Sequence, residues 1–153
     1  MKRSTNNNKG YTLIELMVVV CIISLLLGLG INGIDYLIQW NKLNIAAALL
    51  SSELKNTQSR AFYEGGYYKL QFLPSLDKYK VYKKTKLIDD IILKDIDLFN
   101  TNFKNNNIYF YPNGVPSMGG TVTLKNRRGK VLYVIMTPVT ARVRVSTKPP
   151  ENW

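Results

Sequence analysis

The chain changes its hydrophobic pattern twice along its length, and the first pattern predicts a membrane-crossing helix. Residues 16–31 read LMVVVCIISLLLGLGI and carry no charge. Adding Leu13 and Ile14 extends the apolar stretch to about nineteen positions, broken only by Glu15. That length is close to the roughly twenty residues that a helix needs to cross a bilayer. We therefore expect a transmembrane segment over about residues 13–33.

The second pattern is an amphipathic helix that continues to about Phe62. Apolar residues recur there at three- and four-residue steps, which predicts one apolar stripe along a helix face. No proline occurs between Met1 and Leu73, so residues 11–62 are expected to form one long helix. Gly65 and Gly66 should end it, because glycine is the usual residue at a helix C-terminus. The stripe consists of Leu43, Ala47, Leu50, Leu54 and Ala61.

Beyond Gly66 the apolar positions alternate, which is typical of β-strands. Residues 126–129, Asn-Arg-Arg-Gly, are typical of a hairpin turn. Residues 87–98 mix strand and loop features, and the asparagine-rich residues 101–107 are expected to form an exposed loop. The predicted fold class is α+β: a long N-terminal helix, transmembrane in its first half, packed on a mainly antiparallel β head at residues 63–153. The expected strands cover residues 68–72, 79–82, 108–111, 121–124, 131–137 and 142–145.

The composition excludes several classes of function. The 153 residues contain no histidine and a single cysteine, Cys21. These counts rule out a Ser-His-Asp or Cys-His catalytic set, a structural zinc site and an internal disulfide. The acidic pairs Asp89-Asp90 and Asp95-x-Asp97 fit no known calcium-loop spacing and are expected to be solvated. We predict no enzyme activity, no catalytic residues, no cofactor and no metal.

The residues around the apolar stretch predict its orientation in the membrane. They also disfavour two simpler interpretations of the stretch, a secretory signal peptide and a plain membrane anchor. Residues 1–10 carry Lys2, Arg3 and Lys9 and no acid, so the positive-inside rule keeps the N-terminus in the cytoplasm and places the head outside. A secretory signal peptide is disfavoured because no clear small-x-small cleavage site follows the apolar run. A plain anchor leaves Glu15 unexplained, because a carboxylate inside an apolar span is costly unless it has a partner.

The start of the chain resembles the processing site of type IV prepilins. Residues 10–16, Gly-Tyr-Thr-Leu-Ile-Glu-Leu, follow a short basic leader and precede the apolar run. The resemblance implies that a membrane prepilin peptidase removes residues 1–10 by cutting between Gly10 and Tyr11 and then methylates the new amine of Tyr11. It also implies that Glu15 serves filament assembly. In physical terms, the amine of a neighbouring subunit can neutralise this carboxylate as apolar helices stack.

A second resemblance covers the end of the helix and the C-terminal strands. Residues 54–62 with the following strand, and the ordered segments 110–114, 119–124, 129–134 and 140–145, are similar to the GspH/FimT group of minor pilins and pseudopilins. Residues 74–107 match nothing in that group. The resemblance implies a single-pass protein of the cytoplasmic (inner) membrane that later joins a type IV pilus, a type II secretion pseudopilus or a competence pilus. Its implied partners are the prepilin peptidase, other pilins, the membrane assembly platform and, before assembly, the lipid bilayer.

The charge distribution suggests an alternative function, a DNA-binding minor pilin of a DNA-uptake pilus. The formal net charge is +11, and residues 121–153 carry more than half of it. Arg127 and Arg128 lie in the expected hairpin turn. Arg142 and Arg144 should share one strand face, with Val143 and Val145 pointing inward, and such a patch can contact DNA phosphates.

A C-terminal sequence pattern and the tyrosines are two further features that concern DNA binding. In the FimT branch a C-terminal Gly-Arg-x-Arg pattern is tied to DNA capture, but here Ala141 takes the place of the glycine. The basic residues could equally form a solvated face or one that meets acidic neighbours. Tyrosines such as Tyr67, Tyr79 and Tyr111 are explained better by sheet packing than by stacking on bases. A membrane-anchored surface enzyme remains as a third hypothesis.

Overall fold

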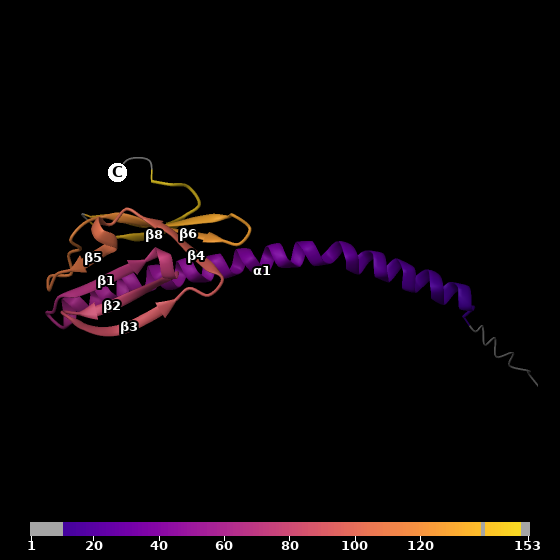
Figure 1. Cartoon of the computed structure of the whole chain (residues 1–153), viewed down its shortest axis with the longest axis horizontal. Helices are drawn as coiled ribbons and strands as arrows, with labels where there is room; N and C mark the ends of the chain where they lie inside the picture. The colour runs from indigo at the N-terminus through magenta and orange to yellow at the C-terminus, as the bar shows by residue number, and fades with distance from the viewer. Residues whose placement is uncertain (1–10, 139, 151–153) are drawn as a thin grey trace, which may run out of the picture. The chain divides into compact units, whose positions relative to one another are not determined.

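A computed structural model describes residues 11–138 and 140–150 (Figure 1). The chain divides into two compact units, one ending at Leu37 and the other beginning at Ile38, and each is described by itself. The leader expected at residues 1–10, including Gly10, lies outside the described residues.

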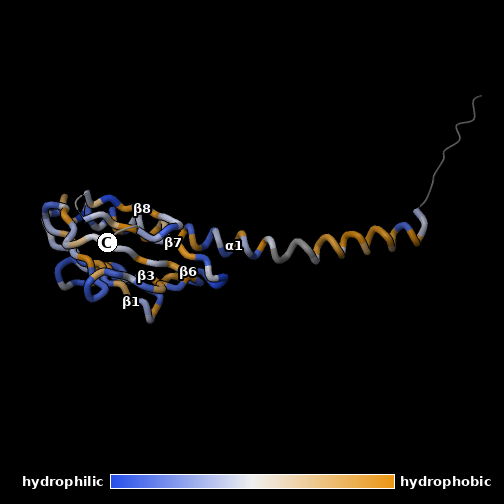
Figure 2. Tube along the Cα trace, turned by 90° about the horizontal axis from the view of Figure 1, so that it is seen from above, coloured by the Kyte–Doolittle hydropathy of each residue, from blue (hydrophilic) through white to orange (hydrophobic). Residues whose placement is uncertain are grey.

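Helix α1 spans Leu13–Tyr63, and its first part forms the first unit. All side chains from Leu13 to Gly28 are exposed, and Figure 2 shows this stretch as predominantly hydrophobic. By length and composition α1 can cross a membrane. A helix that is apolar on all sides needs an apolar environment, which in this unit its own chain does not provide.

The second part of α1 is amphipathic and contributes to the core of the second unit. All five residues of the predicted stripe are fully buried, which confirms the stripe. Thr57 lies on the same face and is also fully buried, although the apolar pattern does not mark it. The helix ends as the glycines predict: Gly65 has a φ of 57°. The N–H of Gly66 donates to the carbonyl of Ala61 at 3.1 Å and that of Gly65 to Phe62 at 3.4 Å, which is a Schellman arrangement.

Among the described residues of the second unit, eight strands form two antiparallel sheets. One sheet has the order β3-β2-β1-β5 and the other β4-β6-β7-β8, and the predicted α+β fold class is confirmed. Short 3₁₀ turns lie at Pro74–Leu76 and Lys104–Asn106. The strands are β1 Tyr68–Leu73, β2 Lys78–Lys83, β3 Lys86–Ile92, β4 Ile96–Thr101, β5 Asn107–Phe110, β6 Gly120–Asn126, β7 Val131–Met136 and β8 Val143–Ser146.

The two sheets and the second part of α1 share one hydrophobic core. Alternate residues of β1 and β6 point into it, including Leu70, Phe72, Val122 and Leu124, which are at most 1 % exposed. The ambiguous region at residues 87–98 resolves into two strands of different sheets. Strand β3 pairs with β2 in the first sheet and β4 pairs with β6 in the second, so the chain changes sheets between Ile92 and Ile96.

The expectation of an exposed loop at residues 101–107 holds only in part: Asn102 and Lys104–Asn106 are exposed and lie outside the strands, whereas residues 101, 103 and 107 do not fit it. Thr101 ends β4 and is buried, and Phe103 is 3 % exposed and stacks on Phe72 with ring centroids 5.5 Å apart. Phe103 is the one large apolar residue in this polar segment, so composition alone does not predict that the segment is anchored in the core. Burying one large aromatic ring stabilises the fold enough to fix a polar connection against the core.

The last predicted strand begins one residue later than expected. Ala141 has a φ of 49°, so the extended conformation starts only at Val143 and Arg142 lies outside β8. Val145 does not point into the core as expected, because it is 42 % exposed. Strand β8 is an edge strand, and the core does not reach Val145.

Candidate functional site

The first turn of α1 is closed by a reciprocal pair of hydrogen bonds between Thr12 and Glu15. The N–H of Glu15 donates to Oγ1 of Thr12 at 3.3 Å, and Oε2 of Glu15 accepts from the N–H of Thr12 at 2.8 Å. The hydroxyl of Thr12 donates to the same carboxylate oxygen at 3.0 Å. This arrangement is a capping box, in which a threonine and the glutamate three residues later satisfy the free donors at a helix N-terminus.

The capping box gives Glu15 two donors within its own chain, which the sequence-based argument missed. That argument treated the carboxylate as lacking any partner until a neighbouring subunit arrives. The Thr-x-x-Glu spacing is the signal that could have revealed the bond. Tyr11 is 90 % exposed and Glu15 is exposed, so both remain accessible to another molecule. One turn of helix therefore holds the carboxylate close to the expected processing point.

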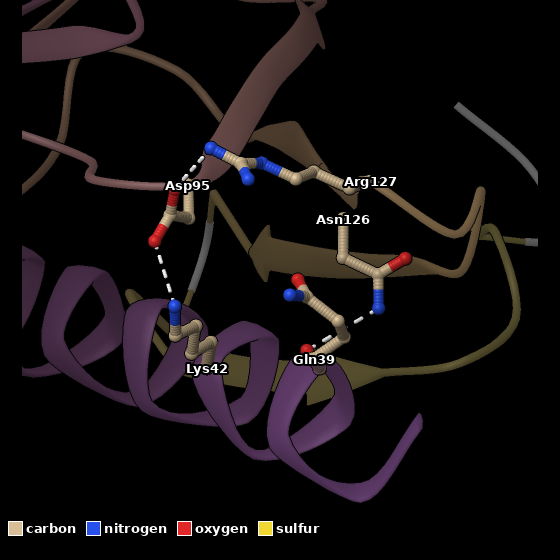
Figure 3. A network of polar contacts seen from close by, with 5 residues as sticks. All are labelled: Gln39, Lys42, Asp95, Asn126 and Arg127. Carbon is tan, nitrogen blue, oxygen red and sulfur yellow. Dashed lines mark hydrogen bonds and ion pairs between the residues drawn. The ribbon is translucent and has the colours of Figure 1, made fainter. Parts of the chain in front are cut away.

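The hairpin-tip arginines do not form a simple patch of unneutralised charge. Arg127 forms an ion pair with Oδ1 of Asp95, and Lys42 of α1 binds the other oxygen, Oδ2, at 2.7 Å (Figure 3). The hydrogen bond from Lys42, followed by the charge of Arg127, holds the pKa of the Asp95 carboxyl below its usual range. Asp95 thus offsets part of the charge of Arg127 and links the β6–β7 hairpin to the helix.

Asn126 is a second link between the hairpin and α1, and the sequence analysis placed it only in a turn. It is 4 % exposed and ends β6. Its Oδ1 accepts from the N–H groups of Arg128 at 3.1 Å and Lys130 at 2.9 Å. Its Nδ2 donates to the carbonyl of Gln39 at 3.3 Å (Figure 3). One side chain therefore shapes the turn and also contacts the helix.

The structure does not bring the four arginine candidates together. Arg142 and Arg144 are both exposed, and Arg144 lies opposite Ile135 near the far end of β7. The hairpin tip instead precedes Val131 at the near end of that strand. Four residues of strand separate the two pairs, which corresponds to about 13 Å. Arg142 and Arg144 are therefore one candidate pair, and Arg127 and Arg128 are another.

Three of the four acidic residues considered for calcium, Asp89, Asp90 and Asp95, form ion pairs with basic side chains of the second unit. Asp89 lies 3.5 Å from Arg60, and Asp90 lies 3.1 Å from Lys78 and 3.6 Å from Lys80. Within residues 11–138 and 140–150, no group of three or more acidic or cysteine side chains gathers in a way suited to a metal ion.

The tyrosines fall into two classes. Tyr68 and Tyr79 are 2 % exposed and belong to the core, as sheet packing predicts. Tyr67, Tyr109 and Tyr111 are 54 %, 46 % and 41 % exposed, so core packing does not account for these three.

Comparison with known proteins identifies the N-terminal motif and the fold. Residues 5–31 match the prokaryotic N-terminal methylation motif, and no match was found among the curated proteins. The minor pseudopilin EpsH from the type 2 secretion system of Vibrio cholerae is similar with a TM-score of 0.58 and 9 % identity, over 69 % of this chain and 96 % of that chain. The type IV minor pilin FimU of Pseudomonas aeruginosa is similar with a TM-score of 0.59 and 13 % identity, over 72 % and 94 %. At these identities the likenesses establish the fold.

Proposed function

Because the methylation motif and the two structural likenesses support a type IV prepilin-like minor pilin or pseudopilin, we propose that this chain is a filament subunit. It is cleaved and N-methylated by a prepilin peptidase and assembled with other pilins into a type IV pilus or a type II secretion pseudopilus. Its role is structural and not enzymatic. Before assembly, the apolar part of α1 anchors it in the cytoplasmic membrane, with the N-terminus in the cytoplasm and the head outside.

One observation carries this proposal: the methylation motif runs directly into an apolar helix whose first turn holds a carboxylate. The helix places Glu15 one turn from Tyr11, where cleavage would create a new amine. An unpaired carboxylate within an apolar span is costly, and because Glu15 lies near the end of the span its cost is below the value of about 2.5–3.5 kcal/mol given for the centre of a bilayer. Pairing with the amine of a neighbouring subunit would remove that cost and fix the register between two helices. The bonds from Thr12 make the carboxylate tolerable in the meantime.

Mass spectrometry of the mature chain tests the processing step. The expected product lacks residues 1–10 and carries one additional methyl group on Tyr11. A variant with Gly10→Val should keep its leader, because the motif then lacks the glycine that precedes the cut. An intact Met1 in the wild-type protein purified from its host would refute the proposal.

Substitutions of Glu15 test the assembly step and separate charge from capping. Glu15→Gln keeps a carbonyl oxygen that can accept the Thr12 hydrogen bonds, but it removes the charge. Glu15→Leu removes both. If the charge guides assembly, both variants should be nearly absent from sheared filaments while remaining in the membrane fraction. Incorporation of Glu15→Leu at the wild-type level would refute the role of the charge. Normal incorporation of Glu15→Gln alone would assign the role to capping.

The alternative function, DNA binding, is supported by one pair of arginines. Arg142 and Arg144 are exposed, and within the described ranges neither forms an ion pair with an acid. The pair is suited to sequence-independent contact with duplex phosphates. We expect salt-dependent retardation of a DNA duplex by the full chain, lost in Arg142→Ala/Arg144→Ala and kept in Arg127→Ala, since Asp95 already binds Arg127. No retardation at low salt would refute this alternative.

A further inference from the structure

We propose that an aromatic and lysine-rich surface where α1 ends binds single-stranded nucleic acid. We name it the tip surface and define it as Phe62, Tyr63, Tyr67, Tyr111, Lys84 and Lys86. It includes none of the four arginine candidates. The inference does not depend on the filament role, because a chain that is processed and assembled normally could still lack this affinity.

Four aromatic rings form two edge-to-face pairs on the tip surface. Phe62 and Tyr63 have ring centroids 5.5 Å apart at an interplanar angle of 74°, and Tyr67 and Tyr111 have centroids 6.0 Å apart at 85°. The turn after Tyr111 connects the two pairs. An added Cβ on Gly114 would lie 3.3 Å from Cβ of Phe62, and the carbonyl of Gly114 accepts from Nε2 of Gln58 at 3.0 Å.

The rings of the tip surface are unusually exposed for aromatic side chains. Tyr63 is 84 % exposed, Phe62 58 %, Tyr67 54 % and Tyr111 41 %. Large apolar side chains left in water make no contribution to the core, and clusters of them mark interaction sites. An edge-to-face pair leaves ring faces open, so each pair can accept a flat ligand group.

Two lysines belong to the tip surface and give it a positive charge. The backbone N–H of Lys84 donates to the backbone carbonyl of Tyr67 at 2.9 Å, so the two residues are neighbours through their backbones. Lys86 lies opposite Lys83 across the β2–β3 turn. Lys84 and Lys86 are exposed, and within the described ranges neither has an ion pair with an acid. Lys83 is different, because it pairs with Glu64, which also accepts from the hydroxyl of Tyr68 at 2.6 Å.

Open aromatic faces beside unneutralised ammonium groups match one ligand chemistry better than others. Bases of a single strand stack on aromatic side chains while lysines contact the backbone phosphates. A duplex keeps its bases inside its own stack, so the rings could not reach them. Aromatic side chains are enriched at protein interfaces as well, but lysine is depleted there, so the lysines are what favours an anionic ligand over a protein partner.

Binding of an oligonucleotide by the full chain in detergent tests the inference. The probe is a fluorescently labelled twenty-nucleotide oligothymidylate, followed by anisotropy at low and moderate salt. We expect salt-dependent binding that weakens at least tenfold in Tyr63→Ala/Tyr67→Ala, because stacking on two rings is lost. Tyr63→Phe/Tyr67→Phe should restore wild-type affinity, since stacking needs the ring and not the hydroxyl. Lys84→Gln/Lys86→Gln should reduce the slope of log affinity against log salt by about 1.4, given about 0.7 per phosphate contact on single strands.

Matched controls make the test specific to the tip surface. Phe99→Ala removes an exposed aromatic ring of β4, in the other sheet, and should leave binding unchanged. All substituted side chains are exposed, and thermal unfolding should confirm that the variants fold. The inference is overturned if oligothymidylate does not bind at low salt, or if a duplex competes equally well. It is also overturned if Phe99→Ala weakens binding as much as the tip variant, or if polyglutamate displaces the oligonucleotide equally well, which would indicate an acidic protein partner.

Discussion

Replacing Asn126 by alanine should destabilise the head more than its position in a surface turn suggests. The side chain is 4 % exposed and makes three hydrogen bonds. A neutral hydrogen bond contributes about 0.5–1.5 kcal/mol to stability. The two short bonds to the turn, at 3.1 and 2.9 Å, should each contribute about 1 kcal/mol. The bond to Gln39, at 3.3 Å, belongs at the lower end of the range.

The expected total loss for Asn126→Ala is about 2.5 kcal/mol. For a head of this size, 1 kcal/mol corresponds to about 4 °C, so the melting temperature should fall by about 10 °C. Near-ultraviolet circular dichroism of the full chain in detergent would follow melting of the head without interference from the helix. The matched control is Asn113→Ala. Asn113 is also a turn asparagine, but it is exposed and makes one such bond, to the N–H of Val115 at 3.1 Å.

The control should lose no more than about 4 °C. A fall of less than about 3 °C for Asn126→Ala, or equal losses for the two variants, would refute the reasoning. Such a result would mean that strand pairing, core packing and the ion pairs of Asp95 hold the hairpin without a measurable contribution from the Asn126 side chain.

The remaining predictions concern packing and titration. Gly120→Ala should cost about 1–3 kcal/mol in denaturant unfolding, because the new Cβ would lie 2.5 Å from the buried ring of Phe103; an unchanged midpoint would contradict this. The Lys83 hydrogen bond, followed by that from the Tyr68 hydroxyl, lowers the pKa of Glu64. The ionised Glu64 carboxylate therefore stabilises the folded chain above the usual carboxyl pKa, and this stabilisation is lost as pH falls through the lowered pKa. Glu64→Gln should make the free energy of unfolding less dependent on pH in the acidic range. Burial raises the pKa of Tyr79 to about 12, so stability should decline as pH rises above about 10. Burial also raises the pKa of Tyr68, so an ultraviolet titration should show at least one tyrosine ionising late; ionisation of every tyrosine near pH 10 in the folded chain would contradict this.

Much of the fold could be predicted because it depends on local periodicity. The stripe from Leu43 to Ala61 predicted the buried helix face residue by residue, since helix geometry repeats every 3.6 residues whatever the partner is. Gly65 and Gly66 predicted the helix end because only glycine readily adopts the left-handed conformation found there. The strands at residues 68–72 and 131–137 were predicted to within one residue.

The sequence-based predictions were wrong where the burial of one residue differs from what its neighbours along the chain indicate. Phe103 lies among asparagines, so composition predicted an exposed loop, but its ring reaches Phe72 and fixes the segment. Val145 follows the alternation of a buried strand, but it is exposed because β8 is at the edge of its sheet. Whether a strand is central or at an edge depends on the order of strands in space, which alternation along the chain does not contain.

The apolar helix and the processing motif could be predicted from the sequence alone, because the residues involved are close together along the chain. The Thr12–Glu15 capping box is equally local, but it was recognised only in the structure. Only the tertiary structure decided that Asp95 binds both Lys42 and Arg127, and that Asn126 reaches Gln39, across separations of 53, 32 and 87 residues. It also decided that the arginines are divided between the two ends of β7. A local pattern fixes which face a side chain takes, whereas a contact across such distances depends on how the strands are ordered and registered.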